Sequence, residues 1–198
     1  MPRAGLTPAT VAEEAARLCD ENGYGRLSLA AVAKRLGVAV PSLYKHVNGL
    51  EGLRRDVAVL SAREFGEVLG RAAMGRSEAD AVRTLAAAYR SYARTRPGRY
   101  AAVQRAPDPV DDEAIAASNS VLEVILAVFR GFDLPEEALI DAVRVFRSAV
   151  HGFVDLEARG GFGLPQSTDH TYEVLVDGLI TALRNWPRPS AGAGGEAS

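Results

Sequence analysis

The chain has 198 residues with 23 basic and 25 acidic side chains, and its net charge of −2 excludes a protein that is basic over its whole length. Hydrophobic residues make up 47% of the chain, which is ordinary for a soluble protein with a sizeable core. The single cysteine excludes an internal disulfide, and no apolar run approaches the roughly 18 to 20 residues that span a bilayer. The first ten residues lack the apolar segment of a signal peptide, so we expect a cytoplasmic protein with no membrane partner.

Helical periodicity runs through most of the chain, and no stretch alternates with period two. The first predicted helix begins at Thr7 or Pro8, which are suited to the cap and the first helical position, and ends at about Asn22 before Gly23. Cys19 lies on its apolar stripe. We expect a small buried residue there, and the alternative is a redox-sensitive thiol.

The stretch from Leu27 to Leu53 predicts two short helices joined by a tight turn. Ser28 is suited to cap the first helix, because its hydroxyl can accept a bond from a free backbone N–H. Gly37 is suited to end it, since glycine adopts the left-handed conformation at little cost. Pro41 is suited to the first turn of the second helix, which we expect to reach Val47. The pattern predicts a helix-turn-helix, whose second helix enters the major groove of DNA.

The charge of this stretch differs from that of the rest of the chain. Between residues 26 and 55 there are six basic side chains and one acidic side chain, a local charge of +5 in a chain of −2. A basic patch on an acidic protein is typical of a surface that binds phosphate. The alternative is that these cations only solvate a helical surface.

These residues resemble the DNA-binding region of TetR-family transcriptional regulators. The matching positions are Leu27, Ser28, Ala33, Lys34, Leu36, Gly37, Val38, Leu43, Tyr44 and His46. The resemblance implies that the partner is a double-stranded DNA operator. The residues that we expect at the DNA are Ser28, Val40, Pro41, Ser42, Tyr44, Lys45 and His46.

Two positions depart from the family pattern. Leu29 stands where many members have a threonine, and Leu50 stands where members often have a lysine that contacts phosphate. Arg54 or Arg55, one turn later, is a candidate replacement for that lysine.

The rest of the chain predicts further helices, so the expected fold class is all-α. We expect a helix from Asn48 to about Ala73 with Asn48 as its cap, and helices over 77–95, 100–105, 111–132, 134–156 and 168–185. The predicted organisation is a DNA-binding domain over 1–48, a helical ligand-binding and dimerisation domain over 49–186, and a disordered tail over 187–198.

The penultimate helix carries two apolar stripes, although a helix inside a subunit of this size normally needs one. The first stripe is Val143, Phe146, Val150 and Phe153, and the second is Val145, Ala149, Gly152 and Leu156. A second stripe with small residues suits a self-complementary dimer face, and the alternative is that a single subunit buries both stripes.

The same segment also resembles a TetR subgroup with a His-Gly pair in this helix, here His151-Gly152, and a tryptophan before it, here Val150. The resemblance implies a homodimer formed by the last two helices. Its expected interface residues are Ala149, Gly152, Phe153, Leu156, Leu175, Leu179 and Leu183.

No motif for catalysis, metal binding or a cofactor is evident. The three histidines lie in three different elements, and no glycine-rich loop precedes a strand–helix unit. We therefore expect no catalytic residues, no metal site and no cofactor.

Aromatic residues at inward positions of the second domain suggest a pocket for a small molecule. They are Phe65, Tyr89, Tyr92, Tyr100, Phe129 and Phe146. We expect a mostly apolar organic effector with one or two hydrogen-bonding groups. Arg90 and Arg94 could favour a carboxylate if they turned inward, and the other alternative is that these aromatics are ordinary core.

The resulting hypothesis is a homodimeric, ligand-responsive transcriptional regulator, a repressor released from a palindromic operator by a small organic effector. One alternative is an activator or a DNA-binding protein without an effector. The alternative of another class is an all-α enzyme or carrier that uses the same pocket.

Overall fold

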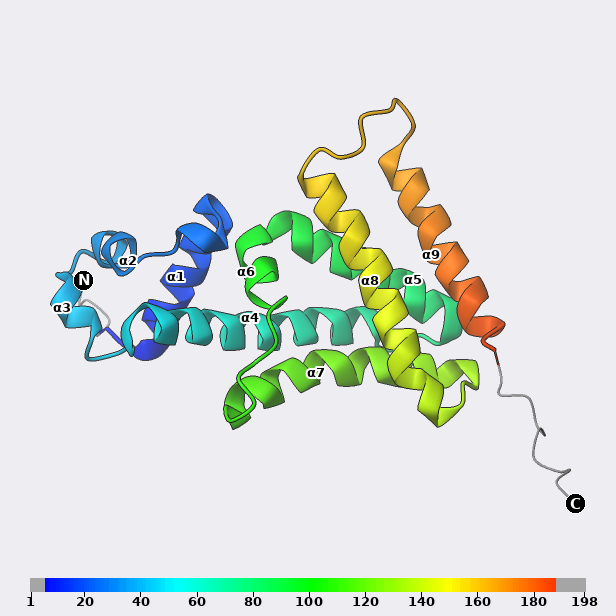
Figure 1. Ribbon diagram of the computed structural model, residues 1–198, viewed down its shortest axis with the longest axis horizontal. Coiled ribbons are helices and arrows are strands. Elements are labelled where there is room, and N and C mark those ends of the chain that lie inside the picture. The colour runs from blue at the N-terminus through cyan, green and yellow to red at the C-terminus, as the bar shows by residue number, and fades with distance from the viewer. Residues whose placement is uncertain (1–5, 188–198) are drawn as a thin grey trace, which may run out of the picture.

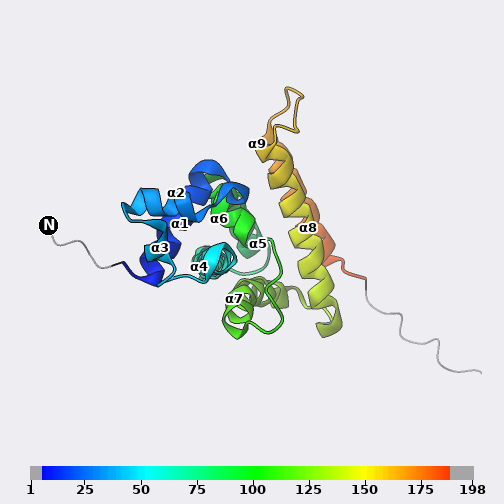
Figure 2. The same ribbon diagram turned by 60° about the vertical axis from the view of Figure 1, so that its left-hand side comes forward.

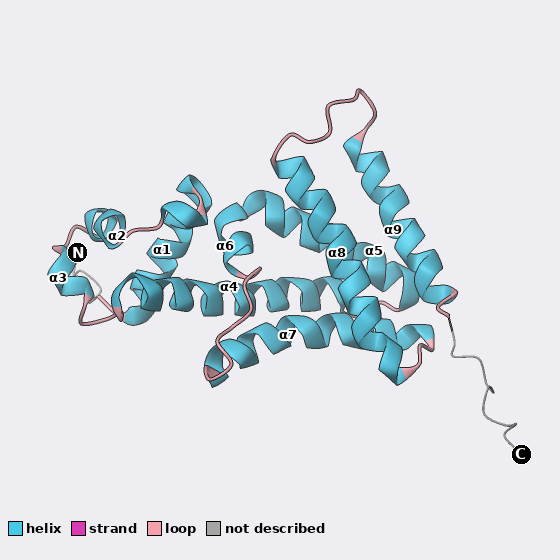
Figure 3. Cartoon of the chain, viewed as in Figure 1, coloured by secondary structure: helices cyan, strands magenta, loops and turns pink. Residues whose placement is uncertain are grey.

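The computed structural model describes residues 6–187, and all regular structure in that part of the chain is helical (Figures 1 and 3). The predicted all-α class is therefore confirmed. Three short helices, α1 to α3, lie at one end of the molecule, and the long α4 runs from them through the rest (Figure 1). The tail predicted to be disordered lies outside the described residues, except for Pro187.

The helices at the N-terminal end have the predicted caps. Helix α1 spans Pro8–Asn22, and Gly23 ends it. It begins with a capping box: the Thr10 backbone N–H donates to the Thr7 hydroxyl, and the Thr7 backbone N–H donates to the Thr10 hydroxyl. Helix α2 spans Leu29–Leu36. The Ser28 side chain accepts a bond from the N–H of Ala31 at 3.2 Å, and Gly37 has φ 68°, the left-handed conformation.

Helix α3 is shorter than predicted. It spans Val40–Leu43, and turns rather than a continued helix lead on to Val47, whose N–H bonds the carbonyl of Leu43 at 3.0 Å. A four-residue helix has few internal bonds, so Leu43 and Val47, both buried, hold this segment against α1 and α2.

Helix α4 spans Gly49–Ala73 and belongs to two cores. Leu53 and Val57 pack with α1 to α3, whereas Phe65 and Leu69 pack with the C-terminal helices. The N-terminal core therefore extends beyond residue 48. Asn48 is at the N-cap position of α4, as predicted, but its side chain makes no hydrogen bond to the start of the helix.

The C-terminal helices are α5 (Glu78–Thr95), α6 (Pro97–Ala102), α7 (Asp112–Phe129), α8 (Leu139–Ala158) and α9 (Thr168–Arg184). Short 3-10 helices lie between α1 and α2, at Tyr24–Arg26, and between α7 and α8, at Arg130–Phe132 and Glu136–Ala138. The short helix expected over 100–105 begins earlier, at Pro97, whose fixed φ suits a first helical position. Figure 2 shows α8 and α9 stacked together on the side of the molecule away from α1 to α3.

The segment Asp112–Phe132 is long and apolar enough to cross a membrane. The expectation that no apolar run approaches the length of a membrane span is therefore wrong. The segment lies along α4 in Figure 1, and Ile125 and Phe129 are fully buried in the core. Glu123 stands near its middle, where a bilayer would strongly disfavour a charge. We therefore assign α7 to the packed helical layer.

Cys19 is fully buried on α1, as predicted for a core residue. Burial raises the pKa of its thiol to about 11. Because the reactive form of cysteine is the thiolate, this environment disfavours a redox-sensing role.

Candidate functional site

The end of α3 presents a polar surface above a buried base. Leu43 and Val47 point into the N-terminal core, as predicted. Tyr44 is 60% exposed, and Lys45 beside it is exposed as well. An aromatic ring this exposed makes little contribution to the core, so the position fits a contact with a partner.

The other residues predicted at the DNA surround these two. Pro41 is exposed, and Ser28, Val40, Ser42 and His46 are half-buried. Ser28 also caps α2, so any contact that it makes to DNA would be in addition to a structural role. The structure thus places most of the predicted set on one short segment at the tip of the molecule.

Several cations at this end are available for phosphate. Arg26, Lys34 and Lys45 are exposed and form no ion pair within residues 6–187, whereas Arg35 is paired with Glu21. Long exposed cations without a carboxylate partner can neutralise phosphates at low cost.

Arg55, one of the two candidates for the lysine absent at Leu50, is bound to carboxylates in the structure. Its guanidinium donates to both carboxylate oxygens of Asp111 at 2.7 and 2.8 Å and to Glu113 at 2.6 Å, and these bonds raise its pKa. It therefore ties α4 to the start of α7. Arg54, the other candidate, is paired with Glu51 at 2.6 Å.

A cavity of about 260 Å³ lies between α4, α5, α7, α8 and the segment after α6. Of the six aromatic residues predicted to bind a ligand, Phe65 and Tyr89 line it. The other four, Tyr92, Tyr100, Phe129 and Phe146, are buried in the core behind them. The polar part of its lining is Gln104, Arg105, Ser118 and Arg147, together with the Tyr89 hydroxyl.

A buried polar chain leads from this cavity to α8. The Tyr100 hydroxyl donates to the Tyr89 hydroxyl at 3.3 Å and lies 2.6 Å from Nδ1 of His151. Burial raises the pKa of both tyrosines, so the two phenols stay neutral at ordinary pH. Tyr100 thus connects α6 to the cavity wall and to α8.

Arg90 and Arg94 do not line this cavity. Arg90 is buried, donates to Glu157 at 2.9 Å and to Asp169 at 2.8 Å, and lies 4.8 Å from the centre of the Tyr172 ring. These contacts join α5 to α8 and α9 and leave its charge compensated.

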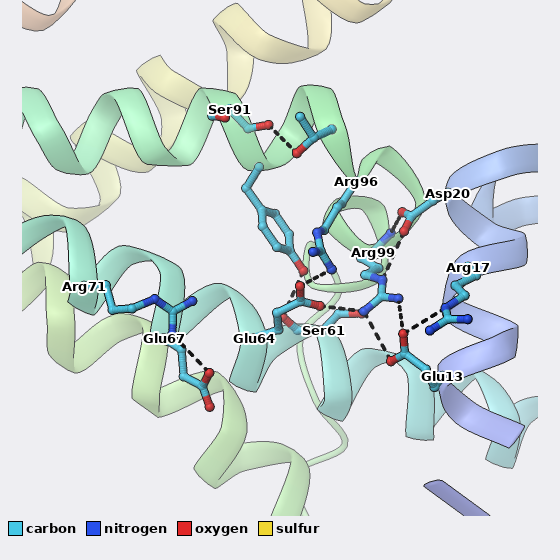
Figure 4. A network of polar contacts seen from close by, with 12 residues as sticks. Glu13, Arg17, Asp20, Ser61, Glu64, Glu67, Arg71, Ser91, Arg96 and Arg99 are labelled. Carbon is cyan, nitrogen blue, oxygen red and sulfur yellow. Dashed lines mark hydrogen bonds and ion pairs between the residues drawn. The ribbon is translucent and has the colours of Figure 1, made fainter. Parts of the chain in front are cut away.

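Helix α6 is joined to α1 and α4 by a buried arginine (Figure 4). Arg99 is 4% exposed and donates to Asp20 at 2.9 and 3.0 Å, to Glu13 at 2.8 Å and to Glu64 at 2.7 Å. Burial alone would lower the pKa of Arg99, but the bonds to Glu13 and Glu64 outweigh it and raise the pKa. Arg96 forms a second ion pair with Glu64.

The neighbouring Gly98 allows this close approach. A Cβ at Gly98 would lie 2.0 Å from the carbonyl carbon of Cys19 and 2.4 Å from the backbone nitrogen of Asp20. Because these are backbone atoms of α1, no side-chain rotation could relieve the contact.

Two family models match the chain. The model described as bacterial regulatory proteins, tetR family, matches residues 3–55, and the model described as tetracyclin repressor-like, C-terminal domain, matches residues 82–179. The HTH-type transcriptional regulator Rv0681 of Mycobacterium tuberculosis is 40% identical over 79% of this chain and 72% of its own. The chain belongs to the TetR family.

One further relative agrees with this assignment, and a solved structure shares the fold. The HTH-type transcriptional regulator YobS of Bacillus subtilis is 30% identical over 93% of this chain and 98% of its own. The crystal structure of the TetR-family protein ActR from Streptomyces coelicolor, in complex with (S)-DNPA, has a TM-score of 0.66 at 18% identity, covering 91% of this chain and 98% of that one. This last likeness shows a shared fold.

In this TetR-family chain, α8 and α9 leave one apolar face uncovered. The first stripe of α8 is buried in the subunit, whereas Val145 and Leu156 of the second are 45% and 50% exposed. The alternative that one subunit buries both stripes is therefore wrong. Val174 on α9 is also exposed, and nothing lies within 4 Å of a Cβ added at Gly152 or Gly178.

The predicted interface residues divide between this face and the core. Ala149, Gly152, Leu156 and Leu175 are half-buried or exposed. Phe153, Leu179 and Leu183 are buried in the subunit's own core, so they support the face from beneath.

The residues that connect the two parts of the molecule were not predicted from the sequence. Gly98 and Arg99 fall between the helices predicted over 77–95 and 100–105, and no sequence pattern relates Gln104, Arg105 and Arg147 to a cavity. A glycine and an arginine inside an otherwise apolar short helix were the available signal, because that context favours neither residue.

Proposed function

We propose that this TetR-family regulator is a cytoplasmic homodimer that binds a pseudo-palindromic operator and represses transcription until a small organic effector releases it. The observation that carries the proposal is the short α3 segment, with exposed Tyr44 and Lys45 over a buried base. The major groove of DNA admits such an element, and its side chains reach base edges and phosphates from there.

Dimerisation would use the uncovered face of α8 and α9. Val145, Leu156 and Val174 are large exposed apolar side chains, and the small residues between them permit close approach of a second copy. A twofold dimer presents two copies of α3, so a half-site spacing of about one helical turn of DNA is expected.

The effector would act through α6. Tyr89 is in the cavity wall and bonds Tyr100 of α6, and the adjacent Arg99 bonds α1 and α4. A ligand that moved α6 would therefore change how α1 and α4 sit together, and with them the position of α3. It can shift that equilibrium only by its differential affinity for the two positions.

The relatives support a regulator, since both are named as HTH-type transcriptional regulators, and ActR was crystallised with a bound compound. An activator or an effector-independent DNA-binding protein would share the α3 surface. An all-α enzyme or carrier would use the cavity without needing that surface, so DNA binding discriminates it.

The test is selection of bound sequences from a random DNA pool, followed by anisotropy titration of the selected site. We expect an inverted repeat bound with a steep salt dependence. Transcription in vitro from a promoter carrying the site then separates repression from activation. Failure to enrich any sequence would contradict the proposal and favour the enzyme or carrier.

A further inference from the structure

The cavity of about 260 Å³ has an apolar inner wall and a positively charged outer wall. Its inner wall contains Phe65, Tyr89 and Ile125, which are almost fully buried. Its outer wall contains Arg105 and Arg147, both exposed side chains. One end is thus apolar and the other carries two positive charges.

These two charges are not compensated. Neither Arg105 nor Arg147 forms an ion pair within the described part of the chain, whereas Arg54, Arg55, Arg90 and Arg99 nearby all do. No aspartate or glutamate is among the residues that line the cavity. Two unpaired arginines beside a cavity that has no carboxylate repel a cationic ligand and attract an anionic one.

From this arrangement we propose that the effector is a small amphipathic organic anion, with an apolar body against Phe65 and Ile125 and a carboxylate-like head between Arg105 and Arg147. That such an anion acts as the effector rests on the proposed function, whereas its binding at this cavity does not. It modifies the expectation of an uncharged effector, since the structure supplies the cationic partner that the sequence did not show.

A neutral ligand and a carboxylate would leave the two arginines with different hydrogen bonds. A neutral ligand that displaced water from the guanidinium groups could offer them neutral hydrogen bonds at best. A carboxylate would replace them with charge-assisted bonds, which are shorter and stronger than neutral ones. Ser118, Gln104 and the Tyr89 hydroxyl add further donors at the same cavity.

The neighbouring groove is a weaker candidate. It measures about 430 Å³ and shares Val103, Arg105 and Pro107 with the cavity. Its other arginines, Arg54 and Arg55, are already bound to carboxylates. It offers room for the tail of a longer ligand rather than a second anion site.

The test compares carboxylates with their own primary amides, which match them in shape and lack the charge. Octanoate, decanoate, benzoate and phenylacetate, each with its amide, would be titrated by calorimetry and thermal shift, with inorganic phosphate at equal ionic strength as the control for general anion effects. We expect at least one carboxylate to bind about tenfold or more tightly than its amide, which corresponds to about 1.4 kcal/mol. No preference for the anion in any pair would overturn the proposal.

Three variants locate the effect. Arg147→Gln should remove the preference for the carboxylate while leaving the affinity for the amide within about twofold. Arg144→Gln is the matched control, because Arg144 stands one turn earlier on α8, is exposed and is paired with Asp141. A preference that persists in a protein with both Arg105→Gln and Arg147→Gln would contradict the assignment.

Operator release, measured by anisotropy in the same samples, separates this inference from the proposed function. If the carboxylate binds at the arginines but leaves the operator complex intact, the anion site stands and the effector role fails. If only amides bind and they release the operator, the effector role stands and the anion site fails.

Discussion

Replacing Gly98 with alanine should weaken the junction between α6 and α1. The added Cβ would lie 2.0 Å from the carbonyl carbon of Cys19, and ordinary contacts begin at about 3.4 Å, so α6 must retreat by more than 1 Å. That shift would lengthen the bonds of 2.9 and 3.0 Å from Arg99 to Asp20. Overpacking typically costs about 1–3 kcal/mol, and the weakened bonds of a buried arginine add to it.

The measurement is the free energy of unfolding from urea denaturation, together with operator affinity by anisotropy. Gly70→Ala is the matched control, because a Cβ there would lie 3.7 Å from Val124, an ordinary contact. Alanine in a helix interior is favoured over glycine by up to about 1 kcal/mol, so the control should be neutral or stabilised. If Gly98→Ala unfolds at the same urea concentration as the unaltered protein, the close packing of α6 on α1 is not as described.

Three further predictions concern the DNA surface, the dimer face and pH. Tyr44→Ala and His46→Ala should each weaken operator binding by about 1–3 kcal/mol with little change in unfolding free energy, because Tyr44 is exposed; unchanged affinity in both would contradict the placement of the recognition surface. Gly152→Leu should yield monomers in sedimentation equilibrium, since a Cβ at this position has nothing within 4 Å in the subunit and a larger side chain there would overpack the face of a second copy; an unchanged dimer would contradict the placement of the interface. Hydrogen bonding to Arg90 lowers the pKa of Glu157 below its ordinary value of 4.5, so its contribution to stability is present above that pH and lost as the pH falls through the lower, folded-state pKa; Glu157→Gln should flatten the dependence of Tm on pH below about 4.5.

Local signals in the sequence carry most of the fold. Ser28 and Gly37 delimit α2 because capping and left-handed glycine are short-range effects, and the same holds for Thr7 and Gly23 around α1. The length of α3 was overestimated because Leu43 and Val47 have helical spacing, but contact with α1 and α2 rather than helical bonds places Val47.

The connections between distant elements could not be predicted in the same way. Arg99 looks like any surface arginine until Glu13, Asp20 and Glu64 are brought to it from two other helices. Arg90 and Arg94 were considered for the cavity because they flank tyrosines in sequence, whereas Arg147, from α8, lines the cavity. Sequence proximity on one helix does not report which helix from elsewhere closes a cavity.

The three consecutive residues Gly98, Arg99 and Tyr100 make α6 the element on which both ends of the molecule depend. Gly98 packs against the backbone of α1, and Arg99 bonds the carboxylate of Asp20. Tyr100 bonds Tyr89 and His151 on the other side. Arg99 and Tyr100 are adjacent in one helix of six residues, so a shift of Tyr100 would also displace Arg99.

The size of that shift limits what an effector must supply. Moving a two-state equilibrium from 1:99 to 99:1 needs about 5.5 kcal/mol of differential affinity. One charge-assisted bond contributes about 1.5–3 kcal/mol, so bonds to both Arg105 and Arg147 reach 5.5 kcal/mol only at the upper end of that range and only if both form solely in the released state. The remainder would come from apolar surface, of which about 100 Å² buried only in the released state provides about 2.5 kcal/mol. An effective ligand therefore needs both its charged head and its apolar body, and a short carboxylate such as acetate should bind without releasing the operator.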